Sequence, residues 1–313
     1  MTETSNATGT QPSPVPRRIT VLMGGPSAER EVSLHTGAAI ANALESLGHQ
    51  VRRADVRPDD LSALDAPADM VFIALHGTWG EDGQLQAILE ERGIRYTGCD
   101  PQASALAMNK VRTKRRFIEV GVPTAPFEHV TPSNAGAVAE GFELPAVVKP
   151  VAEGSSVGCA IARDRPSFSS AVRRLVDDYG EALAERFVDG PELTVGVLAG
   201  QALPVCQIQP SSDFYDYHAK YEADDTAYLF EIELPEGLVR RVQQLSEQAF
   251  EALGCRDMAR IDWIVASSAE PFCLEVNTIP GFTDHSLLPK AAARAGIGFA
   301  DLCQRIVDLA MSR

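Results

Sequence analysis

Long apolar segments are missing from this 313-residue chain, and positive charge is scarce. No apolar run approaches the roughly 20 residues that a membrane-spanning helix needs, and the first residues lack the apolar core of a signal peptide. Lys and Arg number 28 against 43 Asp and Glu, which gives a formal net charge of -15. Because nucleic acids and anionic membranes bind basic surfaces, we expect neither of them as a partner.

Paired metal-binding or redox cysteines are missing too. The six cysteines are scattered, with no CxxC motif and no zinc-like spacing. Several lie in apolar runs, which predicts buried free thiols and a reducing, cytoplasmic setting. The six are Cys99, Cys159, Cys206, Cys255, Cys273 and Cys303.

The dinucleotide motif GxGxxG is also absent, although the chain opens like a nucleotide-binding domain. Residues 19–23 predict a strand, Gly24 and Gly25 follow, and residues 33–47 have the pattern of a helix. This order is Rossmann-like, but without the motif it supports a dinucleotide only weakly. With 45% hydrophobic residues, the chain can bury a large core, and its length indicates two or three domains. Residues 1–16, rich in Ser, Thr and Pro, are expected to form a disordered tail.

Two polar residues follow predicted strands at the edge where open α/β sheets bind their ligands. Glu29 comes after residues 19–23, and His76 comes after the apolar run at residues 70–75. Each also has a structural explanation, Glu29 as a solvated carboxylate near a helix start and His76 as a structural histidine. Taken alone, the pattern favours the structural explanation for Glu29 and neither explanation for His76.

A strand that ends in Lys149 precedes a loop rich in glycine and serine at residues 153–158. Such a loop can present N–H and hydroxyl donors to phosphates, and the lysine can add a positive charge. The same loop can be only a flexible hairpin, but its combination with Lys149 favours a nucleotide. Glu185 and Glu192 flank an apolar strand end further on, and Lys110 is consistent with an ordinary surface lysine on a helix.

Two neighbouring stretches, residues 259–265 and 274–282, alternate apolar with charged or amide residues, as strands do. The short, turn-like link between them predicts a hairpin. Residues two apart on a strand share a face, so the hairpin is expected to gather polar side chains on one side. These side chains are Arg260, Asp262, Glu275 and Asn277. Their oxygen ligands suit Mg²⁺ bound together with substrate phosphates, and a solvated hairpin face is the alternative.

Other segments complete the expected architecture. Strands are predicted at residues 94–97 and 201–209, and helical segments at residues 84–91, 101–120, 236–253 and 299–311. The polar and aromatic residues 210–228 form a long loop of the kind that often covers an active site.

Six ordered motifs carry a family resemblance. They are GGPSAEREVSL at residues 24–34, ALHGTWGEDG at 74–83, KPVAEGSSVG at 149–158, FYDYHAKY at 214–221, GCRDMARIDW at 254–263 and LEVNTIPGFTDHSLLP at 274–289. On these motifs, which extend over nearly the whole chain, it resembles a D-alanine–D-alanine ligase of the ATP-grasp superfamily. The resemblance implies an α/β (α+β) fold with three domains. These are a Rossmann-like N-terminal substrate domain at residues 17–98, a central ATP-grasp subdomain at 99–184, and a C-terminal ATP-grasp subdomain with the metal site and lid loop at 185–313.

For the nucleotide, the resemblance implies that ATP binds as co-substrate between the central and C-terminal subdomains. Lys110 and Lys149 match phosphate-binding lysines, while Glu185 and Glu192 match the residues that hold the adenine amine and the ribose. The other residues implied at the nucleotide are Glu153, Ser155, Ser156, Arg186, Phe187, Val188 and Lys220. Many relatives carry lysine where this chain has Arg186. Two Mg²⁺ ions, which Mn²⁺ can replace, would be held by Asp262, Glu275 and Asn277, with Glu275 bridging.

For the substrates, the resemblance implies that two D-alanine molecules are joined through an acyl phosphate, in peptidoglycan precursor synthesis. Arg260 and the backbone N–H of Gly281 match the groups that stabilise the oxyanion of the tetrahedral intermediate. Glu29 matches the residue that holds the ammonium group of the first D-alanine, and His76 matches a group near its carboxylate. The remaining matches are Ser155 and Tyr221 as partners of Glu29, and Lys220 and Ser286 around the second substrate and the phosphates.

Two other functions are considered beside this one. The nearest is another ATP-grasp ligase that forms a depsipeptide or joins other amino acids. Tyr221 favours the dipeptide, and His218, where close relatives are expected to be acidic, is given no role. A non-catalytic nucleotide-binding module would have lost at least one of the key polar residues, and all are present. Those residues are Lys149, Arg260, Asp262, Glu275 and Asn277. Relatives are commonly dimers, so a homodimer is expected.

Overall fold

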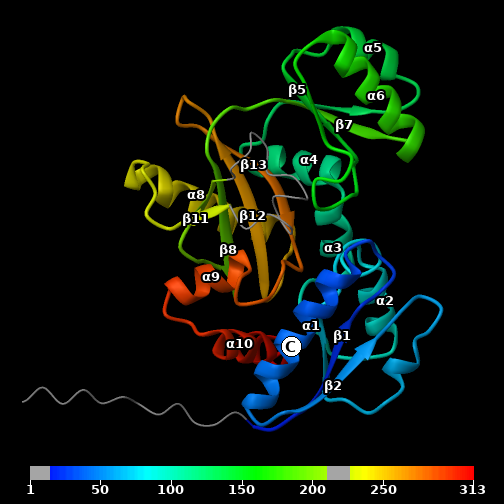
Figure 1. Ribbon diagram of the computed structural model, residues 1–313, viewed down its shortest axis with the longest axis vertical. Helices are drawn as coiled ribbons and strands as arrows, with labels where there is room; N and C mark the ends of the chain where they lie inside the picture. The colour runs from blue at the N-terminus through cyan, green and yellow to red at the C-terminus, as the bar shows by residue number, and fades with distance from the viewer. Residues whose placement is uncertain (1–14, 210–225) are drawn as a thin grey trace, which may run out of the picture.

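The computed structural model describes residues 15–209 and 226–313, and three β-sheets lie along its long axis (Figure 1). The sheet of the N-terminal part lies at one end and the sheet of the central part at the other, with the third sheet between them. None of the helices in the two described ranges has the length and apolar character needed to span a bilayer. The predicted tail up to residue 14 and most of the predicted lid loop lie outside the described residues.

The first sheet is parallel, as the Rossmann-like opening predicts. Its strand order is β2-β1-β3, and its strands are β1 (Arg18–Met23), β2 (Gln50–Asp55) and β3 (Met70–Ile73). All four residues of β3 are buried, which explains its uninterrupted apolar sequence. Alternate residues face opposite sides, so Phe72 joins one hydrophobic cluster and Ile73 another.

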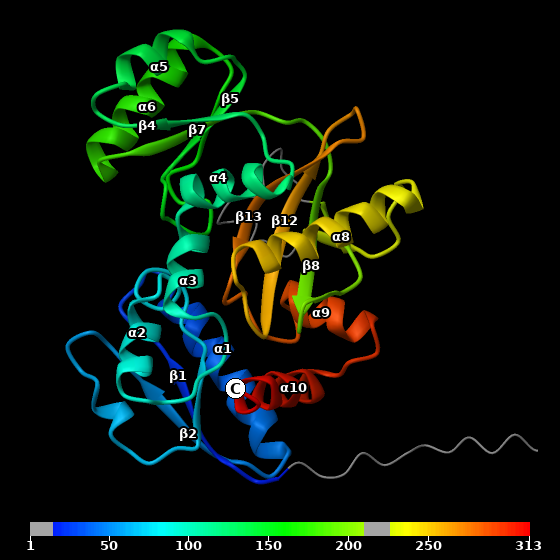
Figure 2. The same cartoon turned by 180° about the vertical axis from the view of Figure 1, so that it is seen from behind.

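Helices from both ends of the chain cover this sheet. Helix α1 (Arg30–Ser46) and the C-terminal helix α10 (Phe299–Met311) lie side by side on the face that contains Phe72 (Figure 2). Helix α2 (Gln84–Glu91) packs on the other face, and a 3₁₀ helix (Ser62–Leu64) joins the same cluster. The bounds of α2 and α10 confirm those predicted from their apolar periodicity.

The strand predicted at residues 94–97 is wrong. Tyr96 makes only an isolated parallel bridge with Val71. Gly98, with φ of +91°, turns the chain away directly afterwards, so the pairing does not extend into a fourth strand.

The second sheet is antiparallel, with the order β4-β7-β5-β6. Its strands are β4 (Phe127–Val130), β5 (Ala146–Lys149), β6 (Ala160–Ala162) and β7 (Ala182–Arg186). Helices α5 (Ala135–Gly141) and α6 (Arg165–Tyr179) cover one face, and the other face turns toward the third sheet (Figure 1).

The third sheet has the order β11-β10-β8-β12-β13, with β9 paired to β8. Its strands are β8 (Glu192–Leu198), β9 (Gln201–Ala202), β10 (Cys206–Gln209), β11 (Ala227–Leu229), β12 (Met258–Val265) and β13 (Pro271–Asn277). Helix α8 (Glu236–Ala252) packs against this sheet, and α9 (Leu287–Arg294) lies at its end toward α10 (Figure 1). The single strand predicted at residues 201–209 is two strands, because the chain leaves the ladder around Pro204, which has no N–H to donate.

The predicted hairpin is confirmed, and its register brings the polar residues together. Strands β12 and β13 are antiparallel, with Arg260 opposite Asn277 and Asp262 opposite Glu275. The predicted helical segment at residues 101–120 is two helices, α3 (Pro101–Met108) and α4 (Lys110–Val120). Asn109 separates them: its ψ of 98° breaks the helix, and its side chain accepts the N–H of Arg112 at 2.9 Å as an N-cap.

All six cysteines are free thiols. Four are buried, as predicted, and burial raises the pKa of Cys303 to about 12. Cys159 and Cys255 are only partly buried.

A buried carboxylate ties the first sheet to the third. Asp257, 5% exposed, accepts the N–H of Gly98 at 2.7 Å and pairs with the guanidinium of Arg313. Arg313 also donates to the carbonyl of Tyr96 at 2.9 Å. We expect Arg313→Ala to lower the free energy of unfolding by about 2 kcal/mol, because the buried carboxylate loses its charged partner.

Denaturant unfolding of Arg313→Ala against Arg305→Ala measures this contribution. Arg305 pairs with Asp301 on the solvent side of α10, the helix that precedes Arg313, so its removal should lower the free energy of unfolding by less than about 1 kcal/mol. Equal losses in the two variants would show that Asp257 does not depend on Arg313.

Candidate active site

Two cavities meet beside the polar face of the β12–β13 hairpin. The first has a volume of about 530 Å³ and lies between the loops of the first sheet, the hairpin and the start of α9. The second has a volume of about 360 Å³ and lies between the second and third sheets. Lys110, Glu153 and Glu275 line both cavities. A group bound in one cavity can therefore reach a group bound in the other across these three side chains.

A hydrogen bond between a loop of the first sheet and a loop of the second closes one side of the first cavity. Glu29 lies in the loop after β1, and Ser155 lies in the loop between β5 and β6 with φ of +50°. The Ser155 hydroxyl donates to Glu29 Oε1. Gly77, with φ of +72°, leaves room for this carboxylate, because a Cβ there would lie 2.7 Å from Glu29 Oε2. The sequence placed Glu29 and Ser155 on separate motifs, and the fold brings them together.

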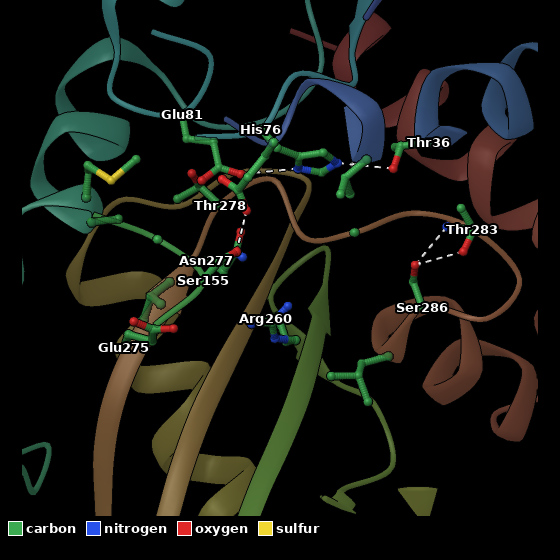
Figure 3. A pocket seen from close by; sticks show the side chains of 18 of the residues that line it. Thr36, His76, Glu81, Ser155, Arg260, Glu275, Asn277, Thr278, Thr283 and Ser286 are labelled. Atoms are coloured by element: carbon green, nitrogen blue, oxygen red, sulfur yellow. Dashed lines mark hydrogen bonds and ion pairs between the residues drawn. The ribbon is translucent and has the colours of Figure 1, made fainter. Parts of the chain in front are cut away.

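His76 also lines the first cavity, where Figure 3 shows it with Glu81 and Thr36. Its Nδ1 is 3.0 Å from the carbonyl of Ile279, and its Nε2 is 3.1 Å from Thr36 Oγ1. Because a carbonyl oxygen only accepts, Nδ1 carries a hydrogen. Glu81 Oε1 lies 3.4 Å from the same nitrogen, so a carboxylate and a carbonyl together fix the imidazole.

Glu81 is a site residue that the sequence analysis did not single out. It lines the first cavity, and burial raises its pKa although the neighbouring His76 acts in the opposite direction. Its position in the GEDG turn after β3, close behind His76, was the available signal.

Arg260 and Asp262 form a paired unit on β12. The guanidinium donates from Nε to Oδ1 at 2.9 Å and from Nη2 to Oδ2 at 2.7 Å, a fork that fixes both side chains. Thr194 on β8 donates to Asp262 Oδ1 at 2.7 Å. Arg260 lines the first cavity and Asp262 the second, so this pair links the two cavities.

Glu275 and Asn277 complete the polar face of the hairpin (Figure 3). Glu275 Oε2 lies 3.9 Å from Lys110 Nζ, and Asn277 Oδ1 accepts the N–H of Ile279 at 3.1 Å. Among the described residues, no group of three His, Cys, Asp or Glu side chains is arranged around a common point for a metal ion. The hairpin instead offers two carboxylates and one amide oxygen. This donor set fits Mg²⁺, which is commonly bound through one or two carboxylates plus substrate phosphates and water.

Gly281 and Ser286 lie side by side on the first cavity. Ser286 is the N-cap residue of α9, and its Oγ accepts the N–H of Thr283 at 3.0 Å, as Figure 3 shows. A Cβ on Gly281 would lie 3.3 Å from that hydroxyl, so the backbone here passes close to the cavity wall.

The second cavity collects most of the residues predicted at the nucleotide. They are Lys110, Lys149, Glu153, Ser156, Glu185, Arg186, Phe187, Val188 and Glu192. Ser155, predicted both at the nucleotide and as a partner of Glu29, lines the first cavity. Lys220 and Tyr221, like His218, lie outside the described residues.

Glu185 is the charged centre of the second cavity. It is 3% exposed, and its Oε1 lies 2.5 Å from Lys149 Nζ. Burial alone would raise the pKa of this carboxyl, but the charges of Lys114 and Lys149 outweigh burial and lower its pKa to about 2. Lys114 is completely buried and was not predicted at the site.

The pH dependence of stability tests this arrangement. A carboxyl with a lowered pKa stabilises the fold above its unfolded value of 4.5, and this contribution disappears as the pH falls toward 2. At pH 7, Glu185→Gln should therefore unfold with a free energy a few kcal/mol below that of the original chain. The two proteins should converge between pH 4.5 and pH 2, as measured by chemical denaturation at each pH. A constant difference would contradict the lowered pKa.

The comparisons with known proteins extend over both halves of the chain. A family model described as "D-ala D-ala ligase C-terminus" matches residues 117–308, and one described as "D-ala D-ala ligase N-terminus" matches residues 47–99. The D-alanine–D-alanine ligase of Anaeromyxobacter dehalogenans (strain 2CP-1) is 45% identical over 296 residues, which are 93% of this chain and 96% of that protein.

Solved structures give the same result. The D-alanine–D-alanine ligase from Bacillus anthracis superposes with a TM-score of 0.84 at 34% identity, covering 94% of this chain and 97% of its own. A D-alanine–D-alanine ligase from Bacillus anthracis complexed with ATP gives a TM-score of 0.79 at 30% identity, covering 95% of this chain and 98% of its own. The VanG D-Ala:D-Ser ligase from Enterococcus faecalis superposes with a TM-score of 0.84 at 26% identity, covering 95% of this chain and 100% of its own. With both halves of the family matched and 45% identity over nearly its full length, this chain belongs to the D-alanine–D-alanine ligase family.

Proposed function

We propose that the chain joins two D-alanine molecules to D-alanyl-D-alanine at the expense of ATP, releasing ADP and phosphate, as a step in making peptidoglycan precursors. The observation that carries this proposal is the shared wall of Lys110, Glu153 and Glu275 between the two cavities. ATP in the second cavity would present its terminal phosphate at this wall, and an amino acid in the first cavity would present its carboxylate there.

The three sheets support a division into domains at residues 17–98, 99–184 and 185–313. Strand β7 (Ala182–Arg186) spans the last boundary as part of the second sheet. In this division, ATP lies between the central and C-terminal parts. The first D-alanine lies between the N-terminal part and the hairpin.

The second cavity is assigned to ATP. Lys149 and Lys110 would contact the phosphates, while Glu185 and Glu192 would bind the adenine amine and the ribose. Arg186, Phe187 and Val188 supply apolar and backbone surface beside the base. The Bacillus anthracis relative complexed with ATP supports the nucleotide assignment.

Asp262, Glu275 and Asn277 are proposed to hold two Mg²⁺ ions, for which Mn²⁺ can substitute. When bound, the ions neutralise charge on the phosphates and so favour transfer of the phosphoryl group. The protein's own contribution is to hold the three ligands on one face, with Asp262 fixed by Arg260 and Thr194.

In the first step, the carboxylate of one D-alanine attacks the γ-phosphorus of ATP, and ADP leaves. A carboxylate oxygen now bridges carbon and phosphorus in an acyl phosphate, which has a far better leaving group than the free acid. Glu29, held by Ser155, would bind the ammonium group of this D-alanine, and His76 would lie near its carboxylate. Both side chains are fixed before substrate arrives, which positions the carboxylate for attack.

In the second step, the amine of the other D-alanine attacks the carbonyl carbon, and phosphate leaves with the former carboxylate oxygen. The tetrahedral intermediate carries negative charge on the carbonyl oxygen. Arg260 and the N–H of Gly281 are proposed to stabilise this oxyanion, since both line the first cavity. Ser286, beside Gly281, would contact the second D-alanine, and Lys220 and Tyr221 would act from the loop beyond the described residues.

Phosphate release from ATP and Mg²⁺ tests the proposed function. We expect release with D-alanine, none with L-alanine, and a dipeptide of two alanines by mass spectrometry. Tubes that add D-lactate or D-serine to D-alanine check the second substrate, since the VanG relative is a D-Ala:D-Ser ligase. A product that joins D-alanine to D-lactate or D-serine, formed in preference to the dipeptide of two alanines, would assign a different second substrate. No phosphate release under any of these conditions would favour a non-catalytic module.

A homodimer in the cytoplasm is part of the same proposal, and the unpaired cysteines support that location. Light scattering of the purified protein measures the oligomeric state, and a monomer at all concentrations would contradict the dimer.

A further inference from the structure

Lys114 is a buried charge that the proposed mechanism does not use. It lies on α4, one turn after Lys110, and its side chain is completely buried. Two lysines four residues apart on one helix face repel each other, so each needs an acidic partner. Lys110 faces Glu275 at 3.9 Å, and Lys114 faces Glu185 at 2.7 Å.

Glu185 is shared between two lysines. Its Oε1 lies 2.5 Å from Lys149 Nζ, and its Oε2 lies 2.7 Å from Lys114 Nζ. The described residues that line the second cavity include Lys149 and Glu185 but not Lys114. Lys114 therefore lies behind the carboxylate, away from a ligand in the cavity.

The other contacts of Lys114 hold it in this place. Its Nζ donates to Thr124 Oγ1 at 2.6 Å, and that hydroxyl donates to the carbonyl of Cys273 at 3.0 Å. Cys273 belongs to β13, the strand that also carries Glu275. Phe127 places its ring 5.9 Å from the same ammonium group. One side chain of α4 thus connects β7 of the second sheet with β13 of the third.

The charges of Lys114, Glu185 and Lys149 explain the role of Lys114 at this position. Glu185 paired with Lys149 alone would make a neutral pair, and Lys149 would have little charge to offer a phosphate. With Lys114 added, two cations share one anion, and the buried group carries a net charge of one positive. Inside a protein, where charges are poorly screened, that remaining charge is felt strongly at the phosphate positions beside Lys149.

We propose that Lys114 is a positioning residue that neutralises and orients Glu185, so that the charge of Lys149 stays available to the polyphosphate of the nucleotide. This inference rests on the proposed function, because it assigns the second cavity to ATP. Lys114 itself does not contact the nucleotide.

The test measures binding of inorganic triphosphate, which has no adenine, by titration calorimetry at fixed ionic strength and fixed Mg²⁺. Glu185→Gln raises the net charge of the group by one, Lys114→Met lowers it by one, and the double variant restores the original value. We expect the affinity for triphosphate to rise with the net charge of this group. Glu185→Gln should bind most tightly, the original chain and the double variant about equally, and Lys114→Met at least about tenfold more weakly than the original chain.

Arg115→Met is the matched control, since it removes one cation from the exposed face of the same helix. Its dissociation constant for triphosphate should lie within about twofold of that of the original chain. In steady-state turnover, Lys114→Met should raise the KM for ATP about tenfold or more and leave kcat within about threefold. A purely structural role for Lys114 would lower the melting temperature without this order of affinities.

Two outcomes would overturn the inference: equal triphosphate affinities for Lys114→Met and Arg115→Met, or a double variant that binds no better than Lys114→Met. If Lys114→Met does not fold alone, the double variant and Glu185→Gln still differ only at Lys114, and the double variant must bind at least about tenfold more weakly. Failure of the original chain to bind triphosphate would instead contradict the assignment of the cavity to ATP.

Discussion

Replacing Glu275 with glutamine is expected to lower dipeptide formation by about 10²–10³-fold or more. Glu275 lies opposite Asp262 on the hairpin and lines both cavities, so it is the side chain through which the two reactants and the metal ions would be connected. Glutamine has the same shape but no charge. The variant should therefore keep its fold while it loses charge compensation at the phosphates.

Initial rates at saturating ATP and D-alanine, with melting temperatures measured in parallel, check this expectation. Glu270→Gln is the control, because Glu270 is an exposed glutamate in the turn that precedes β13. It should retain full activity. Near-normal turnover by Glu275→Gln would refute the role of Glu275 at the metal site.

Arg260→Ala is expected to lower kcat by about 10²–10³-fold, which is the usual cost of losing one oxyanion donor. The guanidinium lines the first cavity and is held in place by its fork to Asp262. Because the charge it would stabilise exists only after the amine attacks, its loss should affect kcat far more than the KM for ATP.

Arg260→Lys separates charge from geometry, since lysine keeps the charge but cannot make the two-point contact with Asp262. We expect an intermediate kcat for this variant, measured with kcat and the KM values for both substrates. A large rise in the KM for ATP with an unchanged kcat in Arg260→Ala would instead place Arg260 at the nucleotide.

The hairpin shows what local sequence can predict. Alternation with a period of two puts the apolar residues of both strands on the core face, so the gathering of Asp262, Glu275 and Asn277 on the other face followed from the pattern. The structure adds the register, in which Asp262 lies opposite Glu275. Local sequence also correctly placed the helices α2 and α10, whose apolar residues recur with the regular spacing of a helix. Strand-end residues such as His76 could be nominated because parallel strands place their carboxyl ends together.

Lys114 and the break at Asn109 show where local sequence fails. The segment from Lys110 to Val120 is strongly basic, and its sequence is consistent with a surface position for Lys110, but the buried face of α4 is set by packing against the second and third sheets. The partner of Lys114 is Glu185, on a strand far along the chain, and no short-range pattern connects them. Asn109 fits a helix by periodicity, but its extended backbone and its cap hydrogen bond to Arg112 show that a new helix starts there.

The most direct test of the account follows the oxygen atoms of the substrate. D-alanine labelled with ¹⁸O in both carboxyl oxygens is supplied with ATP and Mg²⁺, and the released phosphate is analysed by mass spectrometry. An acyl phosphate formed across the shared wall of the two cavities predicts one ¹⁸O in each phosphate, in step with dipeptide formation. Phosphate without ¹⁸O would show that the γ-phosphoryl group never passes to the carboxylate, and would contradict the proposed transfer between the cavities.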